Sequence, residues 1–221
     1  MFNNIAWRYD FLNHFLSFGI DRYWRRKTIS ELKKYNPKLI LDVATGTGDL
    51  AIAALKLHPV KIYGIDISSD MLNIGRKKIK QRKLNTVIEL LESDSENLFF
   101  EDNKFDAITV AFGVRNFENL DKGLSEMRRV LKPGSVAVIL EFSKPNNKLI
   151  RSLYRFYSVK ITPRIGKLIS KDKAAYDYLH ESVEEFASGR EFVSILQQVG
   201  FNKVQCKPLT FGIVSIYLAE K

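Results

Sequence analysis

Cysteine is nearly absent from this sequence, which contains Cys206 and no other. A single thiol excludes an internal disulfide and any metal centre built from several cysteines. Histidine is also sparse, and the three histidines (His14, His58 and His180) form no pair with the spacing of metal ligands. The sequence therefore predicts no bound metal, and its cysteine usage fits a reducing cytoplasm.

Long apolar runs are missing as well. No stretch of about 18 apolar residues occurs, so no transmembrane helix is predicted. Residues 1–8 have neither a basic n-region nor an apolar h-region, and we expect no signal peptide. With 221 residues, 45% of them apolar and 27% charged, the chain is typical of one soluble α/β domain with a substantial core.

The formal net charge of +10 is unevenly distributed along the chain. Residues 1–35 carry a net charge of +4 and residues 144–173 a net charge of +8, whereas residues 36–143 contain fifteen charges of each sign. In the second basic segment nine Lys and Arg alternate with aliphatic and aromatic residues. Such a segment can attract a phosphate backbone or an anionic membrane leaflet, or it can simply keep the protein soluble.

The stretch Leu39–Leu50 (LILDVATGTGDL) has the pattern of a strand, a tight loop and a helix start. Apolar residues lead to Asp42, a small-residue turn with Gly46 and Gly48 follows, and a helical pattern begins at Asp49. Glycines let the backbone approach a ligand closely, and the helix start directs N–H groups toward it. The two glycines followed by an alanine three residues later also fit the dinucleotide fingerprint, so the loop alone leaves the cofactor undecided.

Asp66 narrows the choice of cofactor. It follows the second predicted strand and lies 18 residues beyond Gly48. An acid at about this spacing accepts hydrogen bonds from the two hydroxyls of a ribose, which favours an adenosine cofactor. The alternative for Asp66 is a cap on the helix that begins near Ser69. Asp94 and Ser95 follow the third strand, where a loop can contact the adenine unless it is only a polar turn.

Arg115 and Asn116 follow the fourth strand. Ligands of open α/β sheets bind beyond the carboxyl ends of the strands, so both residues are expected near the ligand.

Strands and helices alternate from Pro37 onward, which predicts a parallel sheet with helices on both faces. The predicted strands are Leu39–Val43, Lys61–Ile65, Val87–Leu91, Phe105–Ala111, Val136–Phe142, Val204–Leu209 and Ile213–Ala219. The predicted helices are Arg22–Lys34 with Asp21 as its N-cap, Asp49–Leu57, Asp70–Gln81, Leu120–Leu131 and Glu191–Val199. The short connection between the last two strands requires antiparallel pairing, so one closing strand should run against the others.

Two segments lie outside the alternation, and the whole chain 1–221 is predicted to form a single domain. Residues 1–35 are rich in aromatics and predict an N-terminal helical lid over an apolar substrate, with ordinary packing against the sheet as the alternative. Residues 144–185 form an insertion before the last helix and the closing strands.

Several motifs occur together over nearly the whole chain: Asp42-x-x-x-Gly46-x-Gly48, Asp66, Tyr9-Asp10, Ser17-Phe18-Gly19-Ile20, Phe112-Gly113-x-Arg115-Asn116, Arg129-Val130-Leu131-Lys132-Pro133-Gly134, Glu141-Phe142-Ser143-Lys144-Pro145, Pro163-Arg164-Ile165-Gly166 and Tyr178-Leu179-x-Glu181-Ser182. This set resembles the class I S-adenosylmethionine methyltransferases and, among them, the menaquinone/ubiquinone-biosynthesis C-methyltransferases. The resemblance implies a Rossmann-like, mostly parallel seven-stranded sheet with one antiparallel closing strand. It also implies S-adenosylmethionine as cofactor. The cofactor-binding residues predicted from the loop pattern and the resemblance together are Asp42, Gly46, Thr47, Gly48, Asp66, Asp94, Ser95 and Ala111.

The reaction implied by the resemblance is methylation of a ring carbon on a reduced, prenylated quinol, with demethylmenaquinol as the first choice. Arg115 is suited to stabilise a developing phenolate and Asn116 to orient the ring, while Tyr9 and Arg164 are candidates for the quinol side. The general base stays open between water, Tyr9 and an arginine. Arg115 has a structural alternative, which is pairing with Glu141.

Other functions explain less of the sequence. A benzoquinol substrate from the ubiquinone pathway is the nearest alternative. An RNA or DNA methyltransferase would need Asn/Asp-Pro-Pro-aromatic after the fourth strand, where this chain has Ala111-Phe112-Gly113-Val114, or a nucleophilic cysteine near the cofactor. A nicotinamide oxidoreductase is disfavoured by the antiparallel close, and a non-catalytic module by the intact motif residues.

The basic segment 144–173 predicts transient docking on an anionic membrane surface, where a prenylated quinol resides. We therefore expect a cytoplasmic protein that is peripheral at the inner face of the membrane, with no nucleic-acid partner. The sequence leaves a homodimer open.

Overall fold

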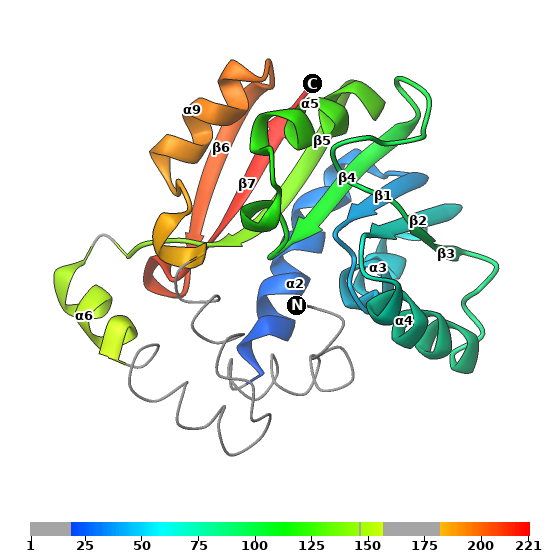
Figure 1. Cartoon of the computed structure of the whole chain (residues 1–221), viewed down its shortest axis with the longest axis horizontal. Helices are drawn as coiled ribbons and strands as arrows, with labels where there is room; N and C mark the ends of the chain where they lie inside the picture. The colour runs from blue at the N-terminus through cyan, green and yellow to red at the C-terminus, as the bar shows by residue number, and fades with distance from the viewer. Residues whose placement is uncertain (1–18, 146, 157–181) are drawn as a thin grey trace.

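The computed structural model describes residues 19–145, 147–156 and 182–221, and within them seven strands form one sheet (Figure 1). The strand order is β3-β2-β1-β4-β5-β7-β6. The strands are β1 (Leu39–Val43), β2 (Lys61–Asp66), β3 (Ile88–Glu92), β4 (Phe105–Ala111), β5 (Leu131–Phe142), β6 (Asn202–Leu209) and β7 (Val214–Glu220). The alternating pattern from Pro37 onward thus predicted every strand of the described sheet.

One strand runs against the rest. The pairs β3–β2, β2–β1, β1–β4 and β4–β5 are parallel, whereas β7 is antiparallel to both β5 and β6. The prediction of a mostly parallel sheet with one antiparallel closing strand is confirmed. The short turn between β6 and β7 leaves no room for a crossover, which is the physical reason for the reversal.

Helices cover both faces of the sheet (Figure 1). One face packs against α5 and α9, and the other against α2, α3 and α4. In β5 the side chains alternate strictly, with Ala137 and Ile139 on the first face and Val136, Val138 and Leu140 on the second. Because successive side chains of a strand point to opposite faces, the sheet has an apolar layer on each face. The helices are α2 (Ile20–Leu32), α3 (Asp49–Ala54), α4 (Ser69–Gln81), α5 (Leu120–Val130), α6 (Lys148–Phe156) and α9 (Arg190–Gln198).

Several predicted boundaries were wrong. The largest difference is in β5, which begins at Leu131 and not at the predicted Val136, so Pro133 and Gly134 lie within the strand. The first described helix begins at Ile20 after Gly19, whose φ of 74° turns the chain, so Asp21 is not the N-cap but lies in the first turn, paired with Arg25. The helix predicted as Leu120–Leu131 ends at Val130, because Leu131 already pairs with Phe105 of the neighbouring strand. Helix α3 ends at Ala54 and continues to Leu57 only as a 3₁₀ turn.

The part of the N-terminal segment that the structure describes packs on the sheet. Trp24 is 5% exposed within the α2–α3–α4 face, and its Nε1 donates to Thr210 Oγ1 at 2.7 Å. The lid predicted for residues 1–35 otherwise lies outside the described residues, as do positions 157–181 of the predicted insertion. None of the helices within the described ranges combines the length and apolarity needed to span a bilayer.

Candidate functional site

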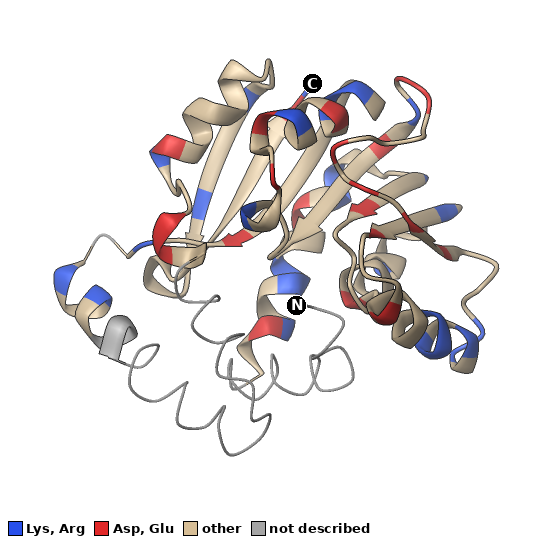
Figure 2. Cartoon of the chain, in the orientation of Figure 1, with Lys and Arg blue, Asp and Glu red and all other residues tan. Residues whose placement is uncertain are grey.

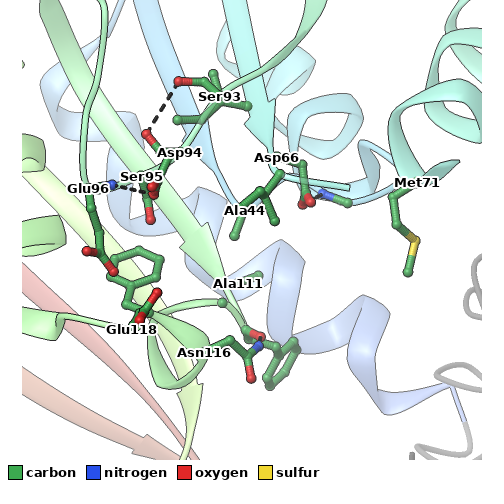
Figure 3. Close-up of a pocket in the computed structure, with 16 residues that line it drawn as sticks. Ala44, Asp66, Met71, Ser93, Asp94, Ser95, Glu96, Ala111, Asn116 and Glu118 are labelled. Carbon is green, nitrogen blue, oxygen red and sulfur yellow. Dashed lines mark hydrogen bonds between the residues drawn. The ribbon is translucent and has the colours of Figure 1, made fainter. Parts of the chain in front are cut away.

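A pocket opens where β1, β2, β3 and β4 end, at the carboxyl edge of the parallel sheet (Figure 3). Four carboxylates line it, from Asp66, Asp94, Glu96 and Glu118. None of the described residues that line it is Lys or Arg. The remaining lining residues are Ala44, Gly46, Ile65, Ile67, Met71, Ser93, Ser95, Ala111, Phe112, Gly113, Asn116 and Phe117.

The charge of this pocket distinguishes between the two cofactors that the glycine loop left open. A dinucleotide carries an anionic pyrophosphate, which four nearby carboxylates would repel. S-adenosylmethionine instead carries a cationic sulfonium and an ammonium group, whose charges exceed that of its one carboxylate. The residues present therefore fit S-adenosylmethionine, although the chain as a whole has a net charge of +10.

The loop after β1 forms one wall of the pocket, and three of its residues are left-handed. Ala44, Gly46 and Gly48 have φ values of 51°, 56° and 83°. Thr45 N donates to Ile65 O at 2.8 Å, which ties the loop to the end of β2. Glycine takes this conformation without a steric penalty, whereas for Ala44 the left-handed conformation costs roughly 1–2 kcal/mol.

Asp42 supports the loop after β1 through buried hydrogen bonds. It is 1% exposed and lies outside the pocket lining, and its two oxygens accept from Thr45 Oγ1 and Thr109 Oγ1, each at 2.6 Å. Burial raises the pKa of Asp42 to about 6, although the hydrogen bonds oppose that shift. Of the other loop residues predicted to bind cofactor, Gly46 lines the pocket, while Gly48 and Thr47 do not. The Thr47 hydroxyl accepts from Lys78 Nζ at 2.8 Å.

This burial gives a testable pH dependence. The ordinary pKa of aspartate is about 3.9, so the unfolded chain loses this proton before the folded protein does. The folded protein therefore binds the proton more tightly than the unfolded chain does. As a result, the free energy of unfolding should fall by up to about 3 kcal/mol as the pH rises from 4 to 6. Urea unfolding of wild type and Asp42→Asn over this range isolates the effect. As the pH rises from 4 to 6, the wild type should lose stability relative to Asp42→Asn. A stability difference that does not change with pH would contradict a raised pKa of Asp42.

Asp66 is the most strongly organised acid in the pocket. Its Oδ2 accepts from Gly46 N at 2.8 Å and its Oδ1 from Ser68 N at 2.9 Å. Burial raises its pKa, and the backbone amides oppose that rise. The backbone amide of Ile67 also acts on this carboxylate. A carboxylate has about four acceptor positions, so these contacts fix its orientation and still leave acceptor capacity for a ligand.

The other predicted site residues divide into three groups. Asp94, Ser95, Ala111 and Asn116 line the pocket, and Asp94 Oδ1 accepts from Glu96 N at 2.9 Å. Arg115 is outside the lining, with Nη1 2.7 Å from Glu141 Oε1. Tyr9 and Arg164 lie outside the described residues.

Sequence reasoning missed several lining residues. Ile67 follows Asp66 directly and is 72% exposed beside the pocket. An apolar residue next to the strand-end acid was a visible clue to it. Phe112 belongs to the motif after the fourth strand, but no role was predicted for it. Met71, Phe117 and Glu118 have no comparable local pattern, because helix orientation and loop shape bring them to the pocket.

Comparison with known proteins finds similar sequences and similar structures. The model of the ubiE/COQ5 methyltransferase family matches residues 1–221. The chain is 51% identical over 222 residues to demethylmenaquinone methyltransferase of Bacteroides fragilis, covering 100% of this chain and 91% of that protein. It is 48% identical over 223 residues to ubiquinone/menaquinone biosynthesis C-methyltransferase UbiE of Geotalea daltonii, covering 100% and 94%. A solved SAM-dependent methyltransferase from Aquifex aeolicus has a TM-score of 0.63 at 24% identity, covering 87% and 88%, which confirms the expected methyltransferase fold.

Proposed function

Because the chain belongs to the ubiE/COQ5 methyltransferase family, we propose that it transfers a methyl group from S-adenosylmethionine to a ring carbon of demethylmenaquinol. It is a methyltransferase enzyme. The full-length similarity to demethylmenaquinone methyltransferases carries the choice of substrate. A benzoquinol of the ubiquinone pathway is the second candidate, because other relatives have both quinones in their names.

Asp66 would hold the ribose of S-adenosylmethionine, since its carboxylate is oriented by backbone amides and can still accept hydrogen bonds from a vicinal diol. Asp94 and Ser95 line the same pocket from the loop after β3 and would lie near the adenine. Ile67 offers exposed apolar surface next to Asp66, which suits the face of a purine ring. When bound, the cofactor supplies an electrophilic methyl group on a sulfonium.

Asn116 is the predicted substrate-side residue that lines the pocket. Its amide can both donate to and accept from a ring hydroxyl, which would orient the quinol carbon toward the methyl group. Tyr9 and Arg164 remain proposals for the quinol side. Arg115 remains a proposal for charge stabilisation, and its guanidinium faces Glu141 in the structure.

One assay tests this function directly. The purified protein, a labelled methyl donor and a short-chain demethylmenaquinol should give methylated product under reducing conditions. Turnover should exceed that with the corresponding benzoquinol. Cofactor binding without transfer to either quinol would contradict the proposal, and preference for the benzoquinol would establish the second candidate.

We also propose that the protein docks on the anionic inner face of the membrane from the cytoplasmic side. The described part of the basic segment supports this, because Lys144, Lys148 and Arg151 are exposed. Figure 2 shows basic positions on α6. Leu149 is 69% exposed on α6 between two of these cations. At the tip of the β6–β7 hairpin Phe211 is 79% exposed. Basic and apolar side chains at one edge match an anionic leaflet.

Docking should be visible by co-sedimentation with vesicles. The protein should bind vesicles with anionic lipid, and salt should weaken the binding. Replacing Arg151, Arg155 and Lys160 by glutamate should reduce binding strongly, because each cation near the leaflet contributes on the order of 1 kcal/mol. The matched control replaces Lys77, Lys80 and Lys83, exposed cations in and just after α4, with the same change in net charge.

An equal loss in both triple variants would show that net charge alone matters and would contradict a docking surface. Tight, salt-resistant binding to RNA would contradict it as well. A homodimer is a further proposal, which light scattering of the purified protein would test.

A further inference from the structure

A buried ion pair lies next to the pocket wall and joins two neighbouring strand ends. Glu141 near the end of β5 is 0% exposed in its side chain, and Arg115 after β4 is 5% exposed. Arg115 Nη1 donates to Glu141 Oε1 at 2.7 Å, and Phe142 N donates to the same oxygen at 2.8 Å. Burial raises the pKa of Glu141, and the guanidinium opposes that rise.

Fold stability alone does not account for this pair. Taking two charges out of water costs several kcal/mol, and apolar residues of similar size often replace such pairs without loss. In the part of the chain that the structure describes, Arg115 Nε is also buried without a hydrogen-bond partner. A donor in that state costs about 1–3 kcal/mol.

The pair does hold a strained residue of the pocket wall. Phe112 has a φ of 58°, a left-handed conformation that is rare for a bulky side chain. Its carbonyl accepts from Arg115 Nη1 at 2.7 Å and lies 3.5 Å from Asn116 Nδ2. Phe112 and Asn116 both line the pocket. Strain of this kind persists only where the surroundings hold it.

Aromatic packing fixes the other side of the same residue. The ring of Phe112 lies 4.7 Å from the ring of Phe142, and the Arg115 guanidinium lies 5.3 Å from that second ring. Phe112 is therefore held at its carbonyl by Arg115 and at its ring by Phe142. The carboxylate of Glu141 holds the guanidinium in the orientation that this arrangement needs.

We propose that Glu141 is a positioning residue for methyl transfer: through Arg115 it fixes the Phe112 carbonyl and so places Asn116 in the pocket. This inference rests on the proposed methyltransferase function. Glu141 itself touches neither cofactor nor substrate in this role. Its effect on the rate should pass through Arg115 and disappear when Arg115 is absent.

A double-mutant cycle tests this coupling with Glu141→Gln, Arg115→Met and the double variant. Each single substitution should lower kcat by about tenfold or more, with cofactor Kd changed by less than about threefold. The double variant should have the kcat of Arg115→Met alone, because two residues that act as one unit are not additive. Its melting temperature should exceed that of Glu141→Gln, since no unpaired charge remains buried.

Amide hydrogen exchange supplies a measurement that needs no substrate. Residues 112–117 should exchange faster in all three variants than in the wild type. The control is Glu89→Gln, which removes the ion pair with Lys61 (2.9 Å) between β2 and β3 and should change neither kcat nor this exchange.

Three results would overturn the proposal. The first is a double variant whose loss of kcat is the product of the two single losses. The second is a double variant that recovers both turnover and stability, and the third is unchanged hydrogen exchange at residues 112–117. If the wild type methylated no quinol, the proposed function would fail, and hydrogen exchange would still decide whether Glu141 positions the wall.

Discussion

Replacing Asp66 with alanine should weaken S-adenosylmethionine binding by about ten- to a hundredfold, because a hydrogen bond to a charged acceptor contributes roughly 1.5–3 kcal/mol. The half-buried carboxylate is held by the amides of Gly46 and Ser68, so it meets a ribose without reorganisation. Calorimetric titration with S-adenosylhomocysteine measures the effect. Asp70→Ala is the control, since Asp70 is exposed on α4 and lies outside the pocket lining.

Asp66 also supports the glycine loop, and a second ligand separates this role from ribose binding. An analogue of S-adenosylhomocysteine without the two ribose hydroxyls should bind the wild type weakly. If Asp66 acts on the ribose, Asp66→Ala should weaken the analogue little further, because the same contact is already lost. A variant that weakens both ligands by the same factor would assign Asp66 to loop support alone.

Gly113→Ala should reduce turnover by about a hundredfold, a loss typical of a displacement near 1 Å at a reacting centre. A Cβ on Gly113 would lie 2.5 Å from the Cβ of Ala44, and both residues line the pocket. The loop after β1 and the turn after β4 would have to separate to accommodate it. The backbone itself permits alanine, since Gly113 has a φ of −113°.

The structure offers a compensating change for this overlap. Ala44→Gly removes the opposing methyl group, and its φ of 51° suits glycine. The double variant Gly113→Ala with Ala44→Gly should recover turnover to within about tenfold of the wild type, because the two effects share one contact. Failure of this rescue, with the protein still folded, would show that the contact does not set the pocket.

The fold was predictable because its information is local. Alternating apolar runs with short connections predicted the strands and the reversal of β7. The glycine loop, with Asp66 at the end of β2, located the pocket edge, since carboxyl ends of parallel strands meet there. The predicted ends of helices were less accurate, because Leu131 leaves the helix to pair with Phe105, a contact 26 residues away that no local pattern contains.

The sequence by itself determined the sheet, its closing strand and the edge where a cofactor pocket forms. Only the tertiary structure decided which residues of the motifs face that pocket. Asp42 has the same motif status as Asp66, yet Asp42 is buried against Thr45 and Thr109 while Asp66 lines the pocket. Arg115 likewise faces Glu141, because β5 lies beside β4 with Leu140 opposite Ala111. The physical reason is that a side chain's direction depends on strand register and on the neighbouring strand, which spacing along the chain does not specify.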